Sequence, residues 1–224
     1  MFGYELLETI GSFAVEAPVA AILRHAARYP ILDVARPELA EITPAGAKAA
    51  EEMGRRLSGF DCLRLFHSPV KRCQQTAECL ARGAGDAGLK ITHLGPEDAL
   101  GVDYILDLAE AGKLSQLHGE DFVRLWIRGE VSPQIIRETK HIAETKMTYL
   151  TRRLSEPTSQ GRRLDLHVSH DWNIMVLREH LLGVRHEEAG WLSFLDGIGF
   201  CLQDGVLRAK YRQEESRQTL PWAF

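Results

Sequence analysis

Short apolar runs alternate along the chain with longer amphipathic stretches, and this alternation predicts strands interleaved with helices. Four such runs are predicted to be strands: Val19–Leu23, Cys62–Phe66, Lys90–Leu94 and Leu164–Ser169. Helices are predicted from Pro44 to about Ser58, from Ser68 to about Arg82 and from Asp171 to Leu182. Regular alternation of this kind favours an α/β fold of three layers, αβα, in which helices cover both faces of a mostly parallel central sheet.

Turn and capping residues set the predicted limits of these elements. Thr43 followed by Pro44 is typical of an N-cap and a first helical position, and Ser68 followed by a proline repeats the pattern. Glycines at 83, 85 and 88 predict a loop after the second helix. Near the C-terminus, Asp204-Gly205 lies between the apolar runs Gly199–Gln203 and Val206–Arg212, which predicts a β-hairpin.

The segment from Glu97 to Arg163 has a different pattern. It is long, helical in its periodicity and placed between two predicted strands, with a turn at about Gly129 to Pro133. We therefore expect one domain over residues 1–224, with residues 97–163 inserted as a helical cap over one end of the sheet.

Composition limits the classes of function. The 224 residues are 45% hydrophobic and 26% charged, as in soluble globular proteins, and the net charge of −4 argues against a nucleic-acid-binding protein. No apolar run approaches the roughly 20 residues of a membrane helix, and the N-terminal residues do not resemble a signal peptide. The four cysteines lack metal-ligand spacing, so we expect reduced, buried thiols and a cytoplasmic location.

The first candidate site follows the strand Val19–Leu23. Here His25 lies between Arg24 and Arg28, with Pro30 completing the segment. Neighbouring positive charges disfavour a third one, so His25 is expected to stay neutral near pH 7, with a ring nitrogen free to attack. Arginine side chains present several planar donors that match a phosphate group. The segment thus predicts a nucleophile inside an anion-binding site.

Two further segments carry candidate residues at predicted strand-to-helix junctions. Arg72 falls in the first turn of a helix, where free backbone amides and the helix dipole already favour anions. His170 can donate a hydrogen bond to a phosphate oxygen, and Asp171 begins a helix where its carboxyl group could reach a leaving-group oxygen. As an alternative, His167, His170 and Asp171 suit a metal ion. Residues three apart in a strand point to opposite faces, however, so we expect no metal site.

Together these segments resemble the histidine phosphatase superfamily, the lineage of phosphoglycerate mutases and acid phosphatases. The similarity covers Arg24–Pro30, Ser68–Glu78 and His167–Asn173, in the family's order. In the first segment Ala26 replaces the glycine of the family's Arg-His-Gly pattern, and an alanine methyl there could crowd the phosphate. The resemblance implies a phosphoglycerate mutase-like fold that spans about residues 19 to 183.

The resemblance also implies roles for the candidate residues. His25 would form a phosphohistidine, while four side chains would bind the phosphoryl group: Arg24, Arg28, Arg72 and His170. In the acid phosphatase branch, the aspartate after the second histidine donates a proton, a role that passes to Asp171. In the mutase branch the acid is a glutamate between the second and third motifs, for which Glu97 is the nearest candidate and Asp98 a weaker one.

These observations predict a metal-independent, cofactor-independent phosphatase that hydrolyses a small phosphorylated substrate. The alternatives are a phosphoglycerate-mutase-type phosphoryl transferase and a non-catalytic module that binds a phosphorylated ligand, which Ala26 alone favours. Trp191 is predicted to anchor the core or the cap. The sequence identifies neither the natural substrate nor the oligomeric state, so a homodimer is neither predicted nor excluded.

Overall fold

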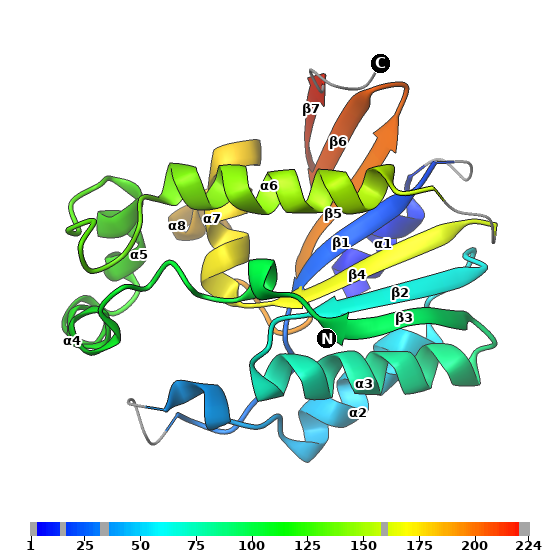
Figure 1. The fold of residues 1–224 in the computed structure, drawn as a ribbon, viewed down its shortest axis with the longest axis horizontal. Helices are drawn as coiled ribbons and strands as arrows, with labels where there is room; N and C mark the ends of the chain where they lie inside the picture. The colour runs from blue at the N-terminus through cyan, green and yellow to red at the C-terminus, as the bar shows by residue number, and fades with distance from the viewer. Residues whose placement is uncertain (1–3, 14–16, 32–35, 158–160, 220–224) are drawn as a thin grey trace.

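The computed structural model describes residues 4–13, 17–31, 36–157 and 161–219, and centres on one seven-stranded sheet (Figure 1). The strands are β1 Val19–Arg24, β2 Cys62–His67, β3 Lys90–Pro96, β4 Arg163–Ser169, β5 Gly197–Gln203, β6 Val206–Tyr211 and β7 Glu214–Thr219. Their order across the sheet is β3-β2-β4-β1-β5-β6-β7. The neighbours β3, β2, β4 and β1 run parallel, while β5, β6 and β7 pair antiparallel.

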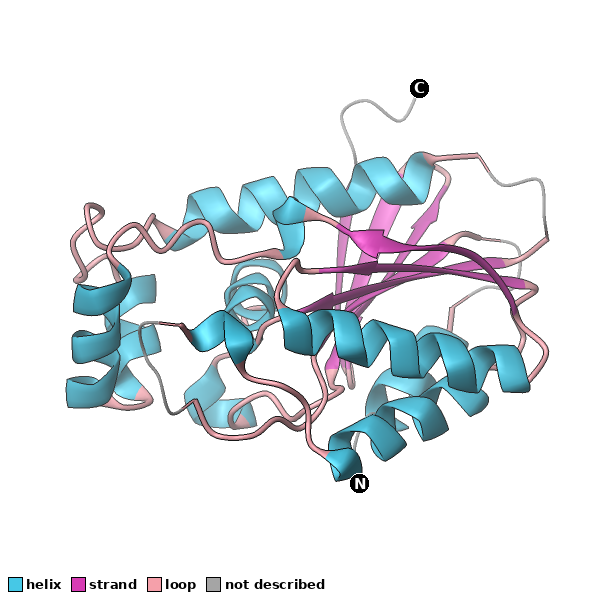
Figure 2. Ribbon diagram, turned by 60° about the horizontal axis from the view of Figure 1, so that its bottom comes forward, coloured by secondary structure: helices cyan, strands magenta, loops and turns pink. Residues whose placement is uncertain are grey.

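Helices cover both faces of the sheet, as expected for a three-layer α/β fold (Figure 2). One face carries α1 Tyr4–Gly11, α2 Pro44–Arg55 and α3 Lys71–Asp86, and the other carries α6 Thr139–Ser155 and α7 Asp171–Leu182. Alternate residues of β1 show the division, because Ala21 and Leu23 join the α2–α3 side of the core whereas Ala20 and Ile22 join the α6–α7 side. The predicted fold class is confirmed.

The helices between β3 and β4 lie in two parts of the molecule, beyond the strand ends and along one face of the sheet. They are η2 Asp98–Leu100, α4 Leu108–His118, α5 Asp121–Ile127 and α6. In Figure 1, α4 and α5 lie beyond the carboxyl ends of the parallel strands, whereas α6 runs along the sheet and contacts β1 and β5. The cap insertion over residues 97–163 stays a prediction, and α4 and α5 are the part of that segment placed beyond the sheet.

The predicted loop at Gly83 and Gly85 is wrong, because α3 continues through both residues to Asp86. Gly83 is buried where α3 crosses α2, and a methyl group on it would overlap the backbone carbonyl of Glu51. Gly54 of α2 makes a matching approach to the Leu80 carbonyl. These two glycines allow α2 and α3 to pack closely. Glycine, which usually weakens a helix, is therefore required in the interior of both helices.

Four elements were not predicted from the sequence: α1, η1 Pro37–Leu39, α8 His186–Ala189 and β7. Helix α1 packs Leu6 and Ile10 into the core on the α2–α3 side. Strand β7 is an almost wholly polar edge strand, joined to β6 by a two-residue turn in which Arg212 has a positive φ of 55°. Polar edge strands resist pairing with other chains but lack the apolar alternation that reveals a strand.

The predicted hairpin near the C-terminus is confirmed. Asp204 and Gly205 both have positive φ and join β5 to β6 in the predicted hairpin. The four cysteines are buried and form no disulfide. Among the described residues, none of the helices combines the length and the apolar character needed to cross a membrane.

Candidate active site

The three candidate segments meet at the carboxyl edge of the parallel strands. Strand β4 lies between β1 and β2, with Arg24 in register with Ser169 and His67 with Val168. The residues that follow these strand ends therefore adjoin one another, as ligand sites do in open α/β sheets. Thr43 holds the first segment from α2, because its amide and its hydroxyl both donate to the Ala27 carbonyl.

The protonation of His25 follows from its two hydrogen bonds. Its Nδ1 lies 2.8 Å from the Ala26 carbonyl oxygen, which can only accept, so Nδ1 carries the proton. Its Nε2 accepts a hydrogen bond from Nε of Arg72 at 3.1 Å, so the lone pair is on Nε2. Burial, reinforced by the Arg72 charge, lowers the pKa of His25 to about 3. As expected, the imidazole is neutral near pH 7.

Arg72 links the two histidines from the first turn of α3. Besides its bond to His25, its Nη2 donates to Nδ1 of His170 at 3.2 Å and its Nη1 donates to the Pro37 carbonyl at 2.8 Å. The side chain is only 8% exposed. A guanidinium fixed in this way holds donors against a ring nitrogen of each histidine.

His170 is the second ring of the pair. Its centroid lies 5.8 Å from that of His25, and its Nε2 donates to Oγ of Ser68 at 2.9 Å. Burial, with the Arg72 charge next, places the pKa of His170 well below its usual value, so its Nδ1 presents a lone pair to Arg72. Cys73 lies behind it, 3.8 Å from Nε2, but burial raises the pKa of the thiol to about 12 and leaves it protonated.

Arg24 and Asp171 form an ion pair beside the histidines. Nη2 of Arg24 lies 2.8 Å from Oδ2 of Asp171, and Nη1 donates to the Leu192 carbonyl. Its Nε is buried and has no hydrogen-bond partner among the residues that the structure describes, which leaves this donor available for a ligand. The Phe194 ring covers the guanidinium at 4.1 Å and lies 5.8 Å from the His25 ring. Phe194 thus forms an aromatic wall of the site.

The carboxyl group of Asp171 is held by two further donors. The Trp191 indole donates to Oδ2 at 3.1 Å, and the Trp172 amide donates to Oδ1 at 3.0 Å. Burial opposes ionisation, but the Arg24 charge and these hydrogen bonds outweigh it, so the pKa of Asp171 is lowered. The interpretation of Trp191 as a core or cap anchor therefore missed its contact with the site, which no local pattern around residue 191 indicates.

The other residues of the first segment lie at the margins of the site. Arg28 donates to the Tyr29 carbonyl at 2.9 Å. Burial, and to a smaller extent the Arg28 charge, lowers the pKa values of Arg24 and Arg72. Ala26 is fully buried, its amide donates to Oγ1 of Thr76, and its methyl packs in the core. The crowding of a phosphate group by this methyl stays a prediction.

Glu97 and Asp98 lie farther along the edge. Glu97 directly follows β3, which lies three strands away from β1 in the sheet. At the usual separation of neighbouring strands this is about 14 Å. The Glu97 carboxylate pairs with Arg153 of α6. Asp98 is exposed at the start of η2. Neither carboxylate has a described contact with His25 or His170.

His167 belongs to a different environment from His170. Its ring stacks on Phe66 at 4.9 Å, and its Nδ1 lies 3.2 Å from the hydroxyl oxygen of Tyr149, on the α6 side of the sheet. The expected divergence of the two histidines is confirmed. Within the ranges that the structure describes, no three His, Cys, Asp or Glu side chains gather as metal ligands would.

Comparison with known families identifies the lineage. Residues 22–197, which include all three segments, match the family model of the histidine phosphatase superfamily, branch 1. The chain belongs to this superfamily. Sequence comparison with curated proteins finds no match.

Several solved structures have folds similar to this one over most of the chain. Phosphoglycerate mutase from Bacillus anthracis has 14% identity and a TM-score of 0.59, with 88% of this chain and 94% of that chain covered. A mycobacterial glucosyl-3-phosphoglycerate phosphatase has 16% identity and a TM-score of 0.59, with 90% and 96% covered. YhfR from Bacillus stearothermophilus has 15% identity and a TM-score of 0.59, with 85% and 94% covered. At these identities the similarity shows the fold, and the superfamily membership supports a histidine phosphatase enzyme.

Proposed function

We propose that this protein is a metal-independent phosphatase that hydrolyses a small phosphomonoester through a phosphohistidine on His25. One observation carries the proposal. The Nδ1 proton of His25 is fixed by the Ala26 carbonyl, so the Nε2 lone pair is directed at the donors of Arg72. A neutral imidazole with its lone pair beside a fixed guanidinium is suited to attack a phosphorus atom whose oxygens that guanidinium binds.

In the proposed reaction Nε2 of His25 forms a bond to phosphorus while the bond from phosphorus to the alcohol oxygen breaks. Donors from four side chains offset the charge on the phosphoryl oxygens, namely Arg24, Arg28, Arg72 and His170. The alcohol leaves with a proton from Asp171. Water then attacks the phosphohistidine, gives its proton to the Asp171 carboxylate, and releases phosphate and neutral His25.

Asp171 is the better supported proton donor. It pairs with Arg24, which directly precedes the proposed nucleophile, whereas Glu97 pairs with Arg153 at the edge of the sheet. Asp171 is ionised in the resting site because Arg24 and the Trp191 indole lower its pKa. A bound phosphate dianion competes for Arg24 and adds negative charge nearby, and both effects favour protonation of Asp171. His170 takes up a proton on Nδ1 for the same reason when it donates to the phosphoryl group.

The first experiment is a p-nitrophenyl phosphate assay with EDTA, comparing the wild type with His25→Ala. We expect turnover in the wild type only, and EDTA-sensitive turnover or an active variant would reject the proposal. Asp171→Asn should slow alkyl phosphates far more than p-nitrophenyl phosphate, because only poor leaving groups require an acid worth ~10²–10⁴-fold. Glu97→Gln is the matched control and should leave this ratio unchanged.

The same preparation tests the remaining alternatives. A phosphoglycerate-mutase-type transferase would convert 3-phosphoglycerate to its isomer without releasing phosphate, whereas a binding module would do neither. A cytoplasmic location is part of the proposal, supported by four buried cysteines without a disulfide.

A further inference from the structure

A polar cavity lies on the α6 side of the sheet, outside the proposed phosphatase site. It has a volume of about 210 Å³ and is enclosed by α6 and the segment at residues 103–104. Its polar lining residues are Asp103, Tyr104, Arg137, His141, Thr145 and Lys146. None of them belongs to the three segments that form the proposed phosphatase site.

Lys146 is a buried cation without a buried anion. Its side chain is 2% exposed, and Nζ donates to the carbonyl oxygens of Ala99 at 2.6 Å and Gly101 at 3.0 Å. Among the described residues no carboxylate lies within ion-pair distance of Nζ. Burial lowers the pKa of Lys146 to about 8, and Asp103 opposes this only in part. Because an ammonium group has three N–H donors, one remains for a ligand. Buried charges in proteins are normally paired, so this cation lacks its usual partner.

Tyr104 supplies a second unused donor. The residue is 2% exposed, and its hydroxyl has no hydrogen-bond partner among the described residues. Burial, followed by the charges of Asp171 and Asp103, raises the pKa of Tyr104, so the phenol keeps its proton. A buried hydroxyl without an acceptor is destabilising, and a ligand oxygen would supply that acceptor.

The mouth of the cavity is also cationic. Arg137 and His141 are both exposed there, and within the described ranges no carboxylate pairs with Arg137. Asp103 is the one acidic group among the lining residues. The cavity therefore offers positive charge and hydrogen-bond donors in excess of acceptors.

The cavity is connected to the catalytic residues through one short segment. The Gly101 carbonyl, which accepts from Lys146, also accepts from Nδ2 of Asn173 at 3.0 Å, and the Leu100 carbonyl accepts from Oγ of Ser169 at 2.8 Å. Ser169 and Asn173 flank His170 and Asp171 in the chain. A ligand on Lys146 therefore lies one chain segment away from the proposed proton donor.

We propose that this cavity binds a small anionic group, a carboxylate or a phosphate, through Lys146, Tyr104 and Arg137. Two sources fit this chemistry: a second anionic group on the substrate's leaving alcohol, or a separate anion that acts on the enzyme. The first source rests on the proposed phosphatase function, and the second does not. In either case these groups recognise the ligand's negative charge and oxygen acceptors.

The test uses Tyr104→Phe, which removes only the hydroxyl, and Arg137→Gln, which alters an exposed side chain. Malonate is the probe, and binding is measured as the rise in melting temperature. We expect malonate to stabilise the wild type and Arg72→Gln, and to bind Tyr104→Phe and Arg137→Gln about tenfold more weakly. Without malonate, Tyr104→Phe should melt at the same temperature as the wild type or higher. Equal malonate binding by the wild type and both cavity variants would overturn the proposal, and so would a loss of binding in Arg72→Gln alone.

Kinetics with 3-phosphoglycerate and glycerol 3-phosphate identify the source. If the leaving group carries the anion, Tyr104→Phe loses about tenfold in kcat/KM for 3-phosphoglycerate and little for glycerol 3-phosphate. If a separate anion binds, malonate changes the rate with p-nitrophenyl phosphate without competing, and Tyr104→Phe abolishes that change. A protein that binds malonate through Tyr104 but hydrolyses no phosphoester would keep this inference and refute the phosphatase.

Discussion

The crossing of α2 and α3 makes a sharp prediction about two glycines of one helix. A methyl group at Gly83 would lie 2.9 Å from the Arg55 amide nitrogen and closer still to the Glu51 carbonyl, so the helices must move apart. Overpacking of this kind costs about 1–3 kcal/mol and occasionally more. At Gly85, two residues along α3, a methyl group meets nothing within 4 Å. There the change to alanine should stabilise the helix by up to about 1 kcal/mol.

The two substitutions should therefore move the melting temperature in opposite directions. In a chain of this size 1 kcal/mol corresponds to about 2–4 °C. A net loss of about 2 kcal/mol in Gly83→Ala lowers the melting temperature by about 4–8 °C, and Gly85→Ala raises it by up to about 4 °C. Thermal unfolding followed by circular dichroism measures both. A Gly83→Ala protein as stable as Gly85→Ala would show that α2 and α3 do not pack this closely.

Three further predictions concern charge. Trp191→Phe removes a hydrogen-bond donor that lowers the pKa of Asp171, so this pKa should rise. The basic limb of the pH profile of kcat should then move to higher pH. An unchanged limb would show that the indole does not act on the proton donor. Because the pKa of His25 is about 3 when folded and 6.5 when unfolded, stability should fall as pH drops from 6.5 towards 3, and His25→Gln should reduce that slope in acid unfolding curves. Asp165→Ala removes the buried carboxylate that pairs with Arg64 and Arg163 and leaves Arg64 only the partly exposed Glu156. It should cost about 3–5 kcal/mol in denaturant unfolding, whereas a loss under 1 kcal/mol would refute the pairing.

Much of the central sheet was predictable because its strands are short apolar runs bounded by strong turn and capping residues. The run Val19–Leu23 is buried throughout, and the helix after Thr43 begins where the N-cap predicts. The end of α3 was not predictable in the same way. Its glycines look like helix breakers locally, and only the approach of α2 explains why Gly83 is tolerated. Tertiary packing there overrides a local preference.

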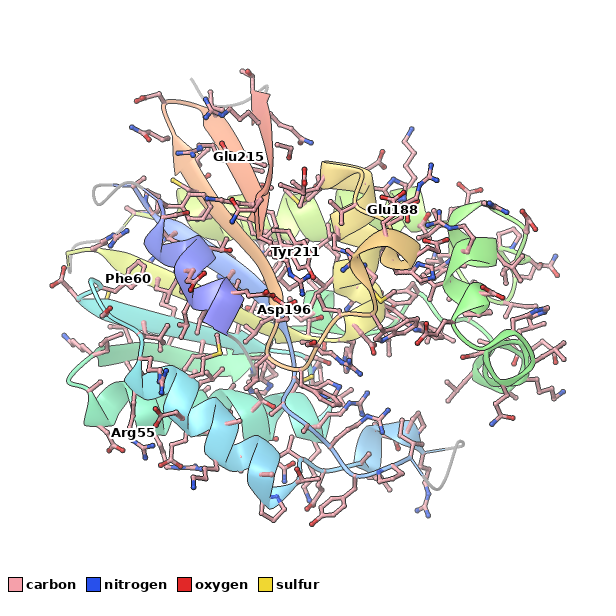
Figure 3. The ribbon with its side chains drawn as sticks, turned by 180° about the vertical axis from the view of Figure 1, so that it is seen from behind. Arg55, Phe60, Glu188, Asp196, Tyr211 and Glu215 are labelled. Carbon is pink, nitrogen blue, oxygen red and sulfur yellow. The ribbon has the colours of Figure 1, made fainter. Side chains whose placement is uncertain are left out.

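The candidate site likewise has a part that the sequence predicts and a part that depends on tertiary contacts. The three segments could be brought together from sequence because each follows a parallel strand, and such strands end at a common edge. Trp191 and Phe194 could not, since they belong to a loop whose place depends on long-range contacts. The Leu195 amide bonds the Arg24 carbonyl, and the Arg24 amide bonds the Asp196 carbonyl, so β1 holds this loop in place. The Tyr211 hydroxyl of β6 donates to the Asp196 carboxylate, and this bond also holds the end of the loop in place (Figure 3).

The charge balance of the resting site explains why a phosphate group, and not a neutral ester, is the expected ligand. Arg24 and Arg72 are buried beside two neutral histidines, and Asp171 is the carboxylate that pairs with Arg24. Nε of Arg24 has no acceptor within the described part of the chain, and Nε of Arg72 donates to the lone pair of His25. Under the proposed function, a phosphate dianion would supply the missing charge and give both donors an oxygen. In the proposed reaction, Arg72 turns its Nε–H to that oxygen and so releases the lone pair of His25, which would make phosphate binding the step that frees the nucleophile.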